Sequence, residues 1–187
     1  MTRKAVLWKW VLIALLGVLS AAVGFYLGQL LVRPVLPGDG GNQQQGLSTP
    51  GHRPAFTLPD TAGQVRSVRE WDGKVLVVNF WATWCSPCRE EMPGFVALQA
   101  EYEGKGVQFL GIAIDESQAV ADYLEAVTVN YPVLLGQLDG IELSRRYGNH
   151  WGALPFTAIV DRQGQIVFTK GGTLTREETQ QHLVPYL

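Results

Sequence analysis

The sequence predicts an α/β domain of three layers, with helices packed on both faces of a mixed central sheet. Apolar strand-like segments alternate with helix-like segments along residues 75–147, which is typical of parallel strands joined by crossover helices. Two further strand-like segments flank a turn and precede a terminal helix. They predict antiparallel strands in the same sheet.

The segment before this domain is expected to anchor the chain in a membrane. Residues 10–32 contain no charged side chain, and the run is long enough to cross a bilayer as a single helix. The flanking charge favours a cytoplasmic N-terminus at residues 1–9 and an extracytoplasmic remainder. The basic residues concerned are Arg3, Lys4 and Lys9 before the run and Arg33 after it. A cleaved signal peptide is the alternative, but the run continues for ten residues past Ala22, where cleavage would fall.

Residues 33–54 are expected to form a flexible linker, because they are rich in Pro, Gly and Gln and almost free of large apolar side chains. The folded domain is then expected at residues 55–187, which is long enough for one good core. After Arg33 the chain has 11 basic and 17 acidic residues. This acidic balance argues against nucleic acid as a partner.

The first half of the domain is expected to hold a small hairpin and two buried strands around a helix. A turn signal at residues 60–63 separates the hairpin strands, and a breaker at residues 104–106 ends the helix. The strands are apolar almost throughout, as in strands covered on both faces. The expected elements are a hairpin at 56–58 and 65–68, a strand at 75–81, a helix at 85–102 and a strand at 107–114.

The second half is expected to continue the alternation and to close with the hairpin. Ser117 can cap a helix, residues 161–164 form a turn signal, and Thr175 followed by two glutamates can open the terminal helix. The expected elements are a helix at 117–130, a strand at 131–135, a helix at 141–147, strands at 156–160 and 165–169, and a helix from 175.

The chain contains two cysteines, Cys85 and Cys88, and both stand in one Cys-Ser-Pro-Cys motif between a strand and a helix. Two thiols at this spacing can interconvert with a disulfide, so the motif predicts a redox site. At the first turn of a helix, unpaired N–H groups and the helix dipole would stabilise a Cys85 thiolate. We therefore expect Cys85 to be the nucleophile and Cys88 the resolving thiol. A purely structural bridge is disfavoured, because so short a loop constrains the unfolded chain very little.

The segment Phe80–Cys88, followed by Pro93, resembles the active-site stretch of the thioredoxin superfamily. Together with residues 72–81, residues 154–161 and the tethered N-terminus, it resembles the membrane-anchored TlpA/ResA-like thiol-disulfide oxidoreductases, with their redoxin-like (AhpC/TSA-like) domain. The resemblance covers essentially the whole domain. It implies a thioredoxin-like fold with a central insertion formed by the expected helix and strand at about 117–135.

The resemblance also assigns further site residues. Pro155 matches the family's cis-proline beside the CxxC motif, and Leu154 before it would offer backbone for strand-like pairing with a substrate. Glu91 matches an acidic position of ResA-like members; it follows Cys88 by three residues, can share its helix face, and could accept or relay the thiol proton. Asn79 stands where thioredoxin itself has a buried aspartate, which makes Glu91 the better candidate for the proton carrier.

The predicted function is reduction of protein disulfides through a Cys85–Cys88 dithiol/disulfide cycle, with Trp84 facing the substrate. The catalytic domain is expected on the periplasmic side of the cell's inner membrane, held by a single-pass helix. The resemblance implies clients in cytochrome c maturation or related thiol maintenance, and electrons from an integral-membrane thiol-disulfide donor. No cofactor or metal is expected. The alternative is a copper-site assembly or copper-binding protein that uses the same cysteines with His150.

Two other cysteine-based functions, a thiol peroxidase and a specialised cytochrome c maturation reductase, fit the sequence less well. A thiol peroxidase would need a threonine farther from its cysteine than Thr83 is from Cys85, and a proline before that threonine, which residues 79–82 lack. Specialised cytochrome c maturation reductases usually have an acid directly after the cis-proline, where Phe156 stands here.

Overall fold

The computed structural model describes residues 51–187, so the expected membrane anchor at residues 10–32 lies outside the described residues. Within the described part, no helix is both long enough and apolar enough to span a membrane. His52 and Arg53, which fall inside the expected linker, already contact the domain. His52 forms a bridge with Gln165, and the Arg53 N–H donates to the Gly164 carbonyl at 2.8 Å.

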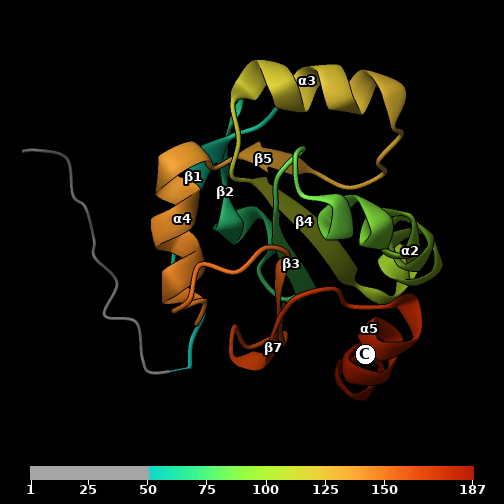
Figure 1. The fold of residues 1–187 in the computed structure, drawn as a ribbon. Helices are drawn as coiled ribbons and strands as arrows, with labels where there is room; N and C mark the ends of the chain where they lie inside the picture. The colour runs from blue at the N-terminus through green and yellow to red at the C-terminus, as the bar shows by residue number, and fades with distance from the viewer. Residues whose placement is uncertain (1–50) are drawn as a thin grey trace, which may run out of the picture. The chain divides into compact units, whose positions relative to one another are not determined.

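The domain is organised around a five-stranded mixed sheet with the strand order β5-β4-β3-β6-β7 (Figure 1). Strand β3 lies at the centre of a mixed sheet, as the sequence predicts. The structure adds its neighbours, with β4 parallel on one side and β6 antiparallel on the other. The five strands are β3 (Val75–Trp81), β4 (Val107–Ala113), β5 (Val133–Leu135), β6 (Phe156–Val160) and β7 (Ile166–Gly171).

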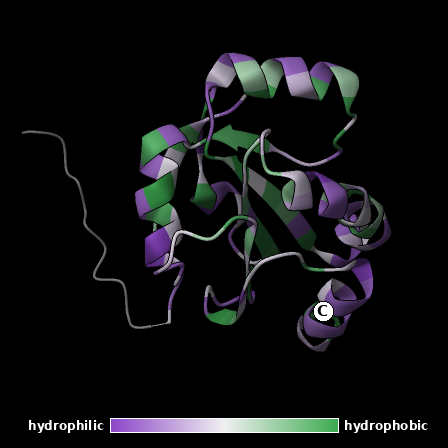
Figure 2. Cartoon of the chain, in the orientation of Figure 1, coloured by the Kyte–Doolittle hydropathy of each residue, from purple (hydrophilic) through white to green (hydrophobic). Residues whose placement is uncertain are grey.

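Helices cover both faces of this sheet, because the side chains of β3 and β4 alternate between two apolar clusters. One face packs against α2 (Ser86–Tyr102), α3 (Ser117–Ala126) and α5 (Arg176–Leu183). The other face packs against α4 (Gln137–Arg146), the short helix η1 (Val68–Trp71) and the separate hairpin of β1 (Thr57–Pro59) and β2 (Val65–Ser67). Figure 2 shows the central strands as largely hydrophobic, whereas the helices carry hydrophilic residues as well. This confirms the three-layer fold and its N-terminal hairpin.

The central insertion is present, but two of its boundaries differ from the prediction. Helix α3 ends at Ala126 rather than near residue 130, and β5 begins at Val133 rather than at 131. The residue after the helix, Val127, is extended, with φ −128° and ψ 115°. It begins a run of β-branched residues, which lose side-chain freedom in a helix and favour extended backbone.

Helix α4 begins at Gln137, four residues before the predicted start at 141. Gly140, just before the predicted start, lies inside the helix, where a Cβ would stand 3.1 Å from the Ile114 side chain. Gly136 is packed still more tightly, because a Cβ there would be 2.9 Å from the Gly140 backbone. These glycines therefore allow α4 to pack closely against the sheet.

Several loops meet at one edge of the sheet. The parallel strands β3, β4 and β5 all end there, and the antiparallel strand β6 begins there, with Phe156 opposite Phe80. The loops that follow β3 and β4 and the loop that precedes β6 therefore lie at the same edge. This edge carries the Cys85–Cys88 pair at the start of α2.

Candidate active site

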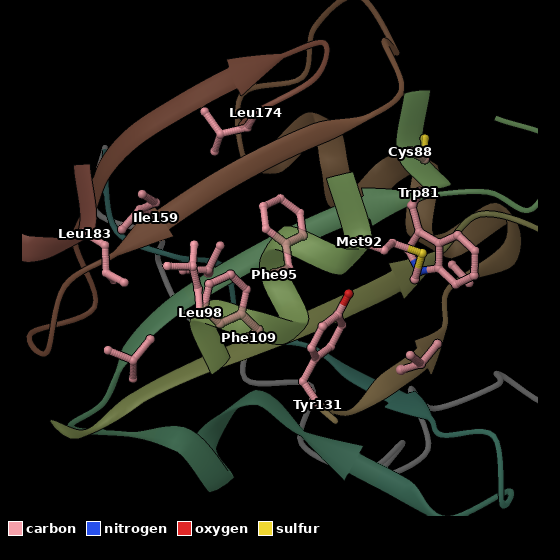
Figure 3. Close-up of a cluster of buried hydrophobic side chains, with 14 of the residues drawn as sticks. Trp81, Cys88, Met92, Phe95, Leu98, Phe109, Tyr131, Ile159, Leu174 and Leu183 are labelled. Atoms are coloured by element: carbon pink, nitrogen blue, oxygen red, sulfur yellow. The ribbon is translucent and has the colours of Figure 1, made fainter. Parts of the chain in front are cut away.

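Cys85 and Cys88 form a disulfide at the N-terminus of α2. Cys85 is the N-cap residue, and its sulfur accepts a hydrogen bond from the Cys88 N–H at an N···S distance of 3.3 Å. Cys85 is 5% exposed, whereas Cys88 is 0% exposed and lies within the apolar cluster beneath the helix. Figure 3 shows Cys88 near Trp81 and Met92 at one end of that cluster. Of the two residues, only Cys85 reaches the solvent.

Glu91 lies on α2, three residues after Cys88, and is buried. Its carboxylate accepts a hydrogen bond from the Asn79 side-chain amide at 2.7 Å and another from the Leu174 N–H at 2.9 Å. Burial disfavours the ionised form and raises the pKa of Glu91 from its ordinary 4.5 to about 7, although both hydrogen bonds and the charge of Lys170 oppose the rise. The carboxyl group can therefore gain and lose a proton near neutral pH.

Asn79 connects Glu91 to the sheet. Its amide nitrogen donates to Glu91 and also to the Thr157 hydroxyl at 3.0 Å, while its amide oxygen has no hydrogen-bond partner among residues 51–187. The family resemblance places Asn79 only at the position of thioredoxin's buried aspartate and predicts no partner for it. The structure adds that one of its hydrogen bonds goes to the titratable group itself.

Asp115 and Thr83 form a second carboxylate contact, one that the sequence analysis does not identify. The Asp115 carboxylate accepts hydrogen bonds from the backbone N–H and from the hydroxyl of Thr83, two residues before Cys85. It also accepts one from the Glu116 N–H at 2.8 Å. Burial raises the pKa of Asp115, but these hydrogen bonds outweigh burial and the net pKa is lowered. The loop that leads into Cys85 is thus fastened to the end of β4.

A signal for this contact exists in the strand register. Trp81 and Ala113 are opposite each other at the ends of the parallel strands β3 and β4. Thr83 and Asp115 each lie two residues beyond that pair. Residues at equivalent positions after two adjacent parallel strands lie close together, so these positions indicate that the two side chains can meet.

The predicted substrate-contact residues lie at the same edge. The Leu154–Pro155 peptide bond is cis, and the Pro155 carbonyl accepts a hydrogen bond from Gly172 at 2.8 Å. Two residues after Gly172, Leu174 donates to Glu91, so the proline loop and the α2 carboxylate share the β7–α5 connection. Trp84, next to Cys85, is 68% exposed.

His150 is not brought into a metal-binding group with the two cysteines. Among residues 51–187, no three or more His, Cys, Asp and Glu side chains are arranged to hold a metal ion. The copper-binding alternative is therefore not supported by a cluster of metal ligands in this part of the chain.

Known proteins are similar to this domain in both sequence and fold. Residues 50–183 match the Redoxin family model. The thiol-disulfide oxidoreductase ResA of Geobacillus thermodenitrificans is 33% identical over 131 residues, which cover 70% of this chain and 73% of that protein. ResA of Bacillus anthracis is 31% identical over 172 residues, with 91% and 92% covered.

A solved structure of a thiol:disulfide interchange protein also has this fold. The thiol:disulfide interchange protein of the thioredoxin family from Chlorobium tepidum superposes with a TM-score of 0.65 and 27% identity, over 72% of this chain and 94% of that one. The chain therefore belongs to the Redoxin family and, within the thioredoxin superfamily, to the TlpA/ResA-like thiol-disulfide oxidoreductases.

Proposed function

We propose that this protein reduces disulfides in other proteins, with Cys85 as nucleophile, Cys88 as resolving thiol and Glu91 as proton acceptor. The observation that carries the proposal is the Cys85–Cys88 disulfide at the N-terminus of α2, with the buried Glu91 carboxyl three residues after Cys88. Burial also raises the pKa of Glu91 to about 7. A general base functions best when its pKa is near the working pH. A carboxyl group with the ordinary pKa of 4.5 would be a poor acceptor for a thiol proton.

The cycle begins with attack of the Cys85 thiolate on one sulfur of the substrate disulfide. The second substrate sulfur leaves as a thiolate and takes up a proton, and a mixed disulfide joins Cys85 to the substrate. Cys88 then gives its proton to Glu91, attacks the Cys85 sulfur and closes the intramolecular disulfide. The remaining substrate thiolate is released and is protonated. Two electrons have passed from the dithiol to the substrate.

The substrate polypeptide is proposed to bind beside Cys85, where Trp84, Leu154 and Pro155 are its contacts. The exposed Trp84 gives an apolar surface next to the nucleophile. Leu154 lies before the β3–β6 pairing, which begins at Phe156, so its backbone lies outside that ladder. Backbone outside a ladder can pair with an extended peptide, and neighbouring side chains then add specificity.

The site is proposed to work outside the cytoplasm, tethered to the inner membrane through residues 10–32. The uncharged run and the basic residues before it support this orientation. An oxidising compartment does not keep dithiols reduced, so a membrane-embedded thiol-disulfide donor is proposed to restore Cys85 and Cys88 after each turnover. Proteins of cytochrome c maturation are proposed clients. Cell fractionation combined with protease protection tests the anchor and its orientation.

Replacing the resolving thiol tests the catalytic proposal. In the full chain, Cys88→Ser keeps Cys85 but cannot close the intramolecular disulfide, so substrate proteins should accumulate as mixed disulfides. Non-reducing electrophoresis should detect them, and reductant should release them. Cys85→Ser is the matched control and should trap none. The proposal is wrong if both variants trap proteins equally, or if neither does.

The copper alternative makes a different prediction for the same protein. It requires the reduced chain to retain copper through Cys85 and Cys88, with His150 as a further ligand. Metal analysis of the reduced full chain, compared with His150→Ala, distinguishes it from disulfide exchange.

A further inference from the structure

Trp151 is the most exposed large apolar side chain among residues 51–187, with 96% of its surface in solvent. It lies in the loop between α4 and β6. Single exposed apolar residues are common on proteins, so exposure alone assigns no role. The shape and location of the loop are what make this tryptophan informative.

A buried asparagine holds the loop in shape. The Asn149 side chain donates to the Ala153 carbonyl at 2.9 Å and accepts from the Ala153 N–H at 2.9 Å, so one amide closes the loop across its base. The same amide also contacts the Ser144 hydroxyl at 3.4 Å. The loop is therefore internally fixed, and Trp151 stands at its tip instead of packing onto the domain.

The base of this loop adjoins the active site through a series of contacts. Ala153 packs over Gly171, where a Cβ would be 3.5 Å from the Ala153 side chain. The next residues are Leu154 and the cis-proline, whose carbonyl contacts Gly172. The β7–α5 connection then contacts Glu91 through the Leu174 N–H at 2.9 Å. The Trp151 loop is thus continuous with the Leu154–Pro155 edge on which the proposed substrate lies.

We propose that Trp151 is a specificity residue that binds an apolar or aromatic side chain of an extended polypeptide substrate, close to the disulfide being reduced. This inference rests on the proposed function. Trp151 precedes Leu154 by three residues, so a substrate chain that pairs with the Leu154 backbone, as proposed above, would bring its flanking side chains to the loop. Tryptophan is enriched among residues that dominate protein binding energies, because it offers a large rigid surface at low entropic cost. Trp84, beside the nucleophile, gives the site a second exposed tryptophan.

The test compares substrates that do and do not reach the loop. In the full chain, Trp151→Ala should lower kcat/KM about tenfold for a disulfide peptide with leucine and phenylalanine beside its cysteines, through KM with kcat unchanged. It should leave a matched serine-flanked peptide and the small disulfide hydroxyethyl disulfide unaffected. Trp151→Phe should restore most of the loss. Val65→Ala on β2, at a side chain 69% exposed, is the matched control and should change nothing.

The outcomes separate this inference from the proposed function. If the unmodified chain reduces neither the peptides nor hydroxyethyl disulfide, the proposed function fails. If it reduces them and Trp151→Ala is unchanged on the apolar peptide, or equally impaired on hydroxyethyl disulfide, only the role of Trp151 is overturned. If Trp151→Ala has unchanged peptide kinetics but loses binding to lipid vesicles or loses self-association, the substrate-binding role of Trp151 is also overturned. Trp151 would then contact a lipid surface or a second copy of the chain.

Discussion

Two carboxyl groups lie near the CxxC motif, and their surroundings shift their pKa values in opposite directions. Glu91 lies behind the motif, buried between α2 and the sheet, and burial raises its pKa to about 7. Asp115 lies at the end of β4, partly exposed, and its hydrogen bonds from Thr83 and Glu116 hold its pKa below the usual value. One carboxyl group is therefore poised to titrate at neutral pH, and the other is held ionised.

The difference indicates separate roles for the two groups. A group that changes charge near pH 7 can exchange a proton with a thiol, whereas a group that stays ionised can only act as a fixed hydrogen-bond acceptor. Glu91 is thus suited to the chemistry of Cys88. Asp115 is suited to holding the loop before Cys85 in place. Four predictions test this division, beginning with the largest effect.

The first prediction concerns the pH dependence of stability. The pKa of Glu91 is about 7 in the folded chain and should return to about 4.5 on unfolding. Between these values the folded state binds more protons, so the free energy of unfolding should fall as pH rises from 4.5 to 7, by up to about 3 kcal/mol. Urea unfolding of the disulfide form across this range measures it. Glu91→Gln should abolish this component, and Glu90→Gln, at an exposed neighbouring position, should retain it.

The second prediction concerns the resolving step. Glu91→Gln removes the proposed acceptor for the Cys88 proton, so closure of the mixed disulfide at pH 7 should slow by on the order of a hundredfold. Stopped-flow measurement of substrate release from a preformed mixed disulfide at Cys85 reports that step. In the unmodified chain the rate should rise with pH through about 7. A Glu91→Gln variant with the same rate and pH profile as Glu90→Gln would remove Glu91 from the mechanism.

The third prediction changes the pKa of Glu91 without removing the carboxyl group. Asn79→Leu deletes the amide that donates to the carboxylate, and loss of a hydrogen bond to a charged group should raise the pKa of Glu91 by about one further unit. The inflection in the resolving rate should move up by the same amount. Thr157→Val, which removes the other partner of Asn79, should move it less. Equal inflections in Asn79→Leu and the unmodified chain would contradict a direct effect of Asn79.

The sequence predicts the parts of this site that depend on short-range spacing. The almost continuous apolar character of residues 75–81 correctly predicts a central strand, and the spacing of Cys88 and Glu91 correctly predicts that the two share one helix face, which is buried. The Leu154–Pro155 peptide is cis, as the family resemblance implies. Each of these features is encoded within a single element or motif.

The missed features are contacts between segments far apart in the chain. The Asp115–Thr83 contact depends on the register of two parallel strands, and the Asn79–Glu91 contact on how a helix sits over the sheet. Hydrophobic patterns indicate which face of an element is buried, but they do not determine which polar side chains meet once the elements pack. The shape of the Trp151 loop cannot be predicted from the sequence for the same reason. It depends on the two hydrogen bonds between the Asn149 side chain and the Ala153 backbone, which form only in the folded loop.

The fourth and smallest prediction addresses Asp115. Asp115→Asn weakens the charge-assisted hydrogen bonds to Thr83, so the free energy of unfolding at pH 7 should fall by about 1 kcal/mol. Because the folded pKa of Asp115 is lowered, its stabilising effect should be present above its ordinary value of 3.8 and be lost as pH falls below it. Thr83→Val removes the hydroxyl donor to the same carboxylate, so the two substitutions together should cost less than their sum.

The decisive control for Asp115 is the inflection near pH 7 in the resolving rate. A fixed acceptor that only positions the loop should leave the pKa of Glu91 where it is, so Asp115→Asn should lower the rate at all pH values without moving the inflection. A shift as large as that expected for Asn79→Leu would mean that the two carboxylates are electrostatically coupled through the motif. In that case Asp115 would take part in setting the proton affinity of the site, and the division between a titrating and a fixed carboxylate would not hold.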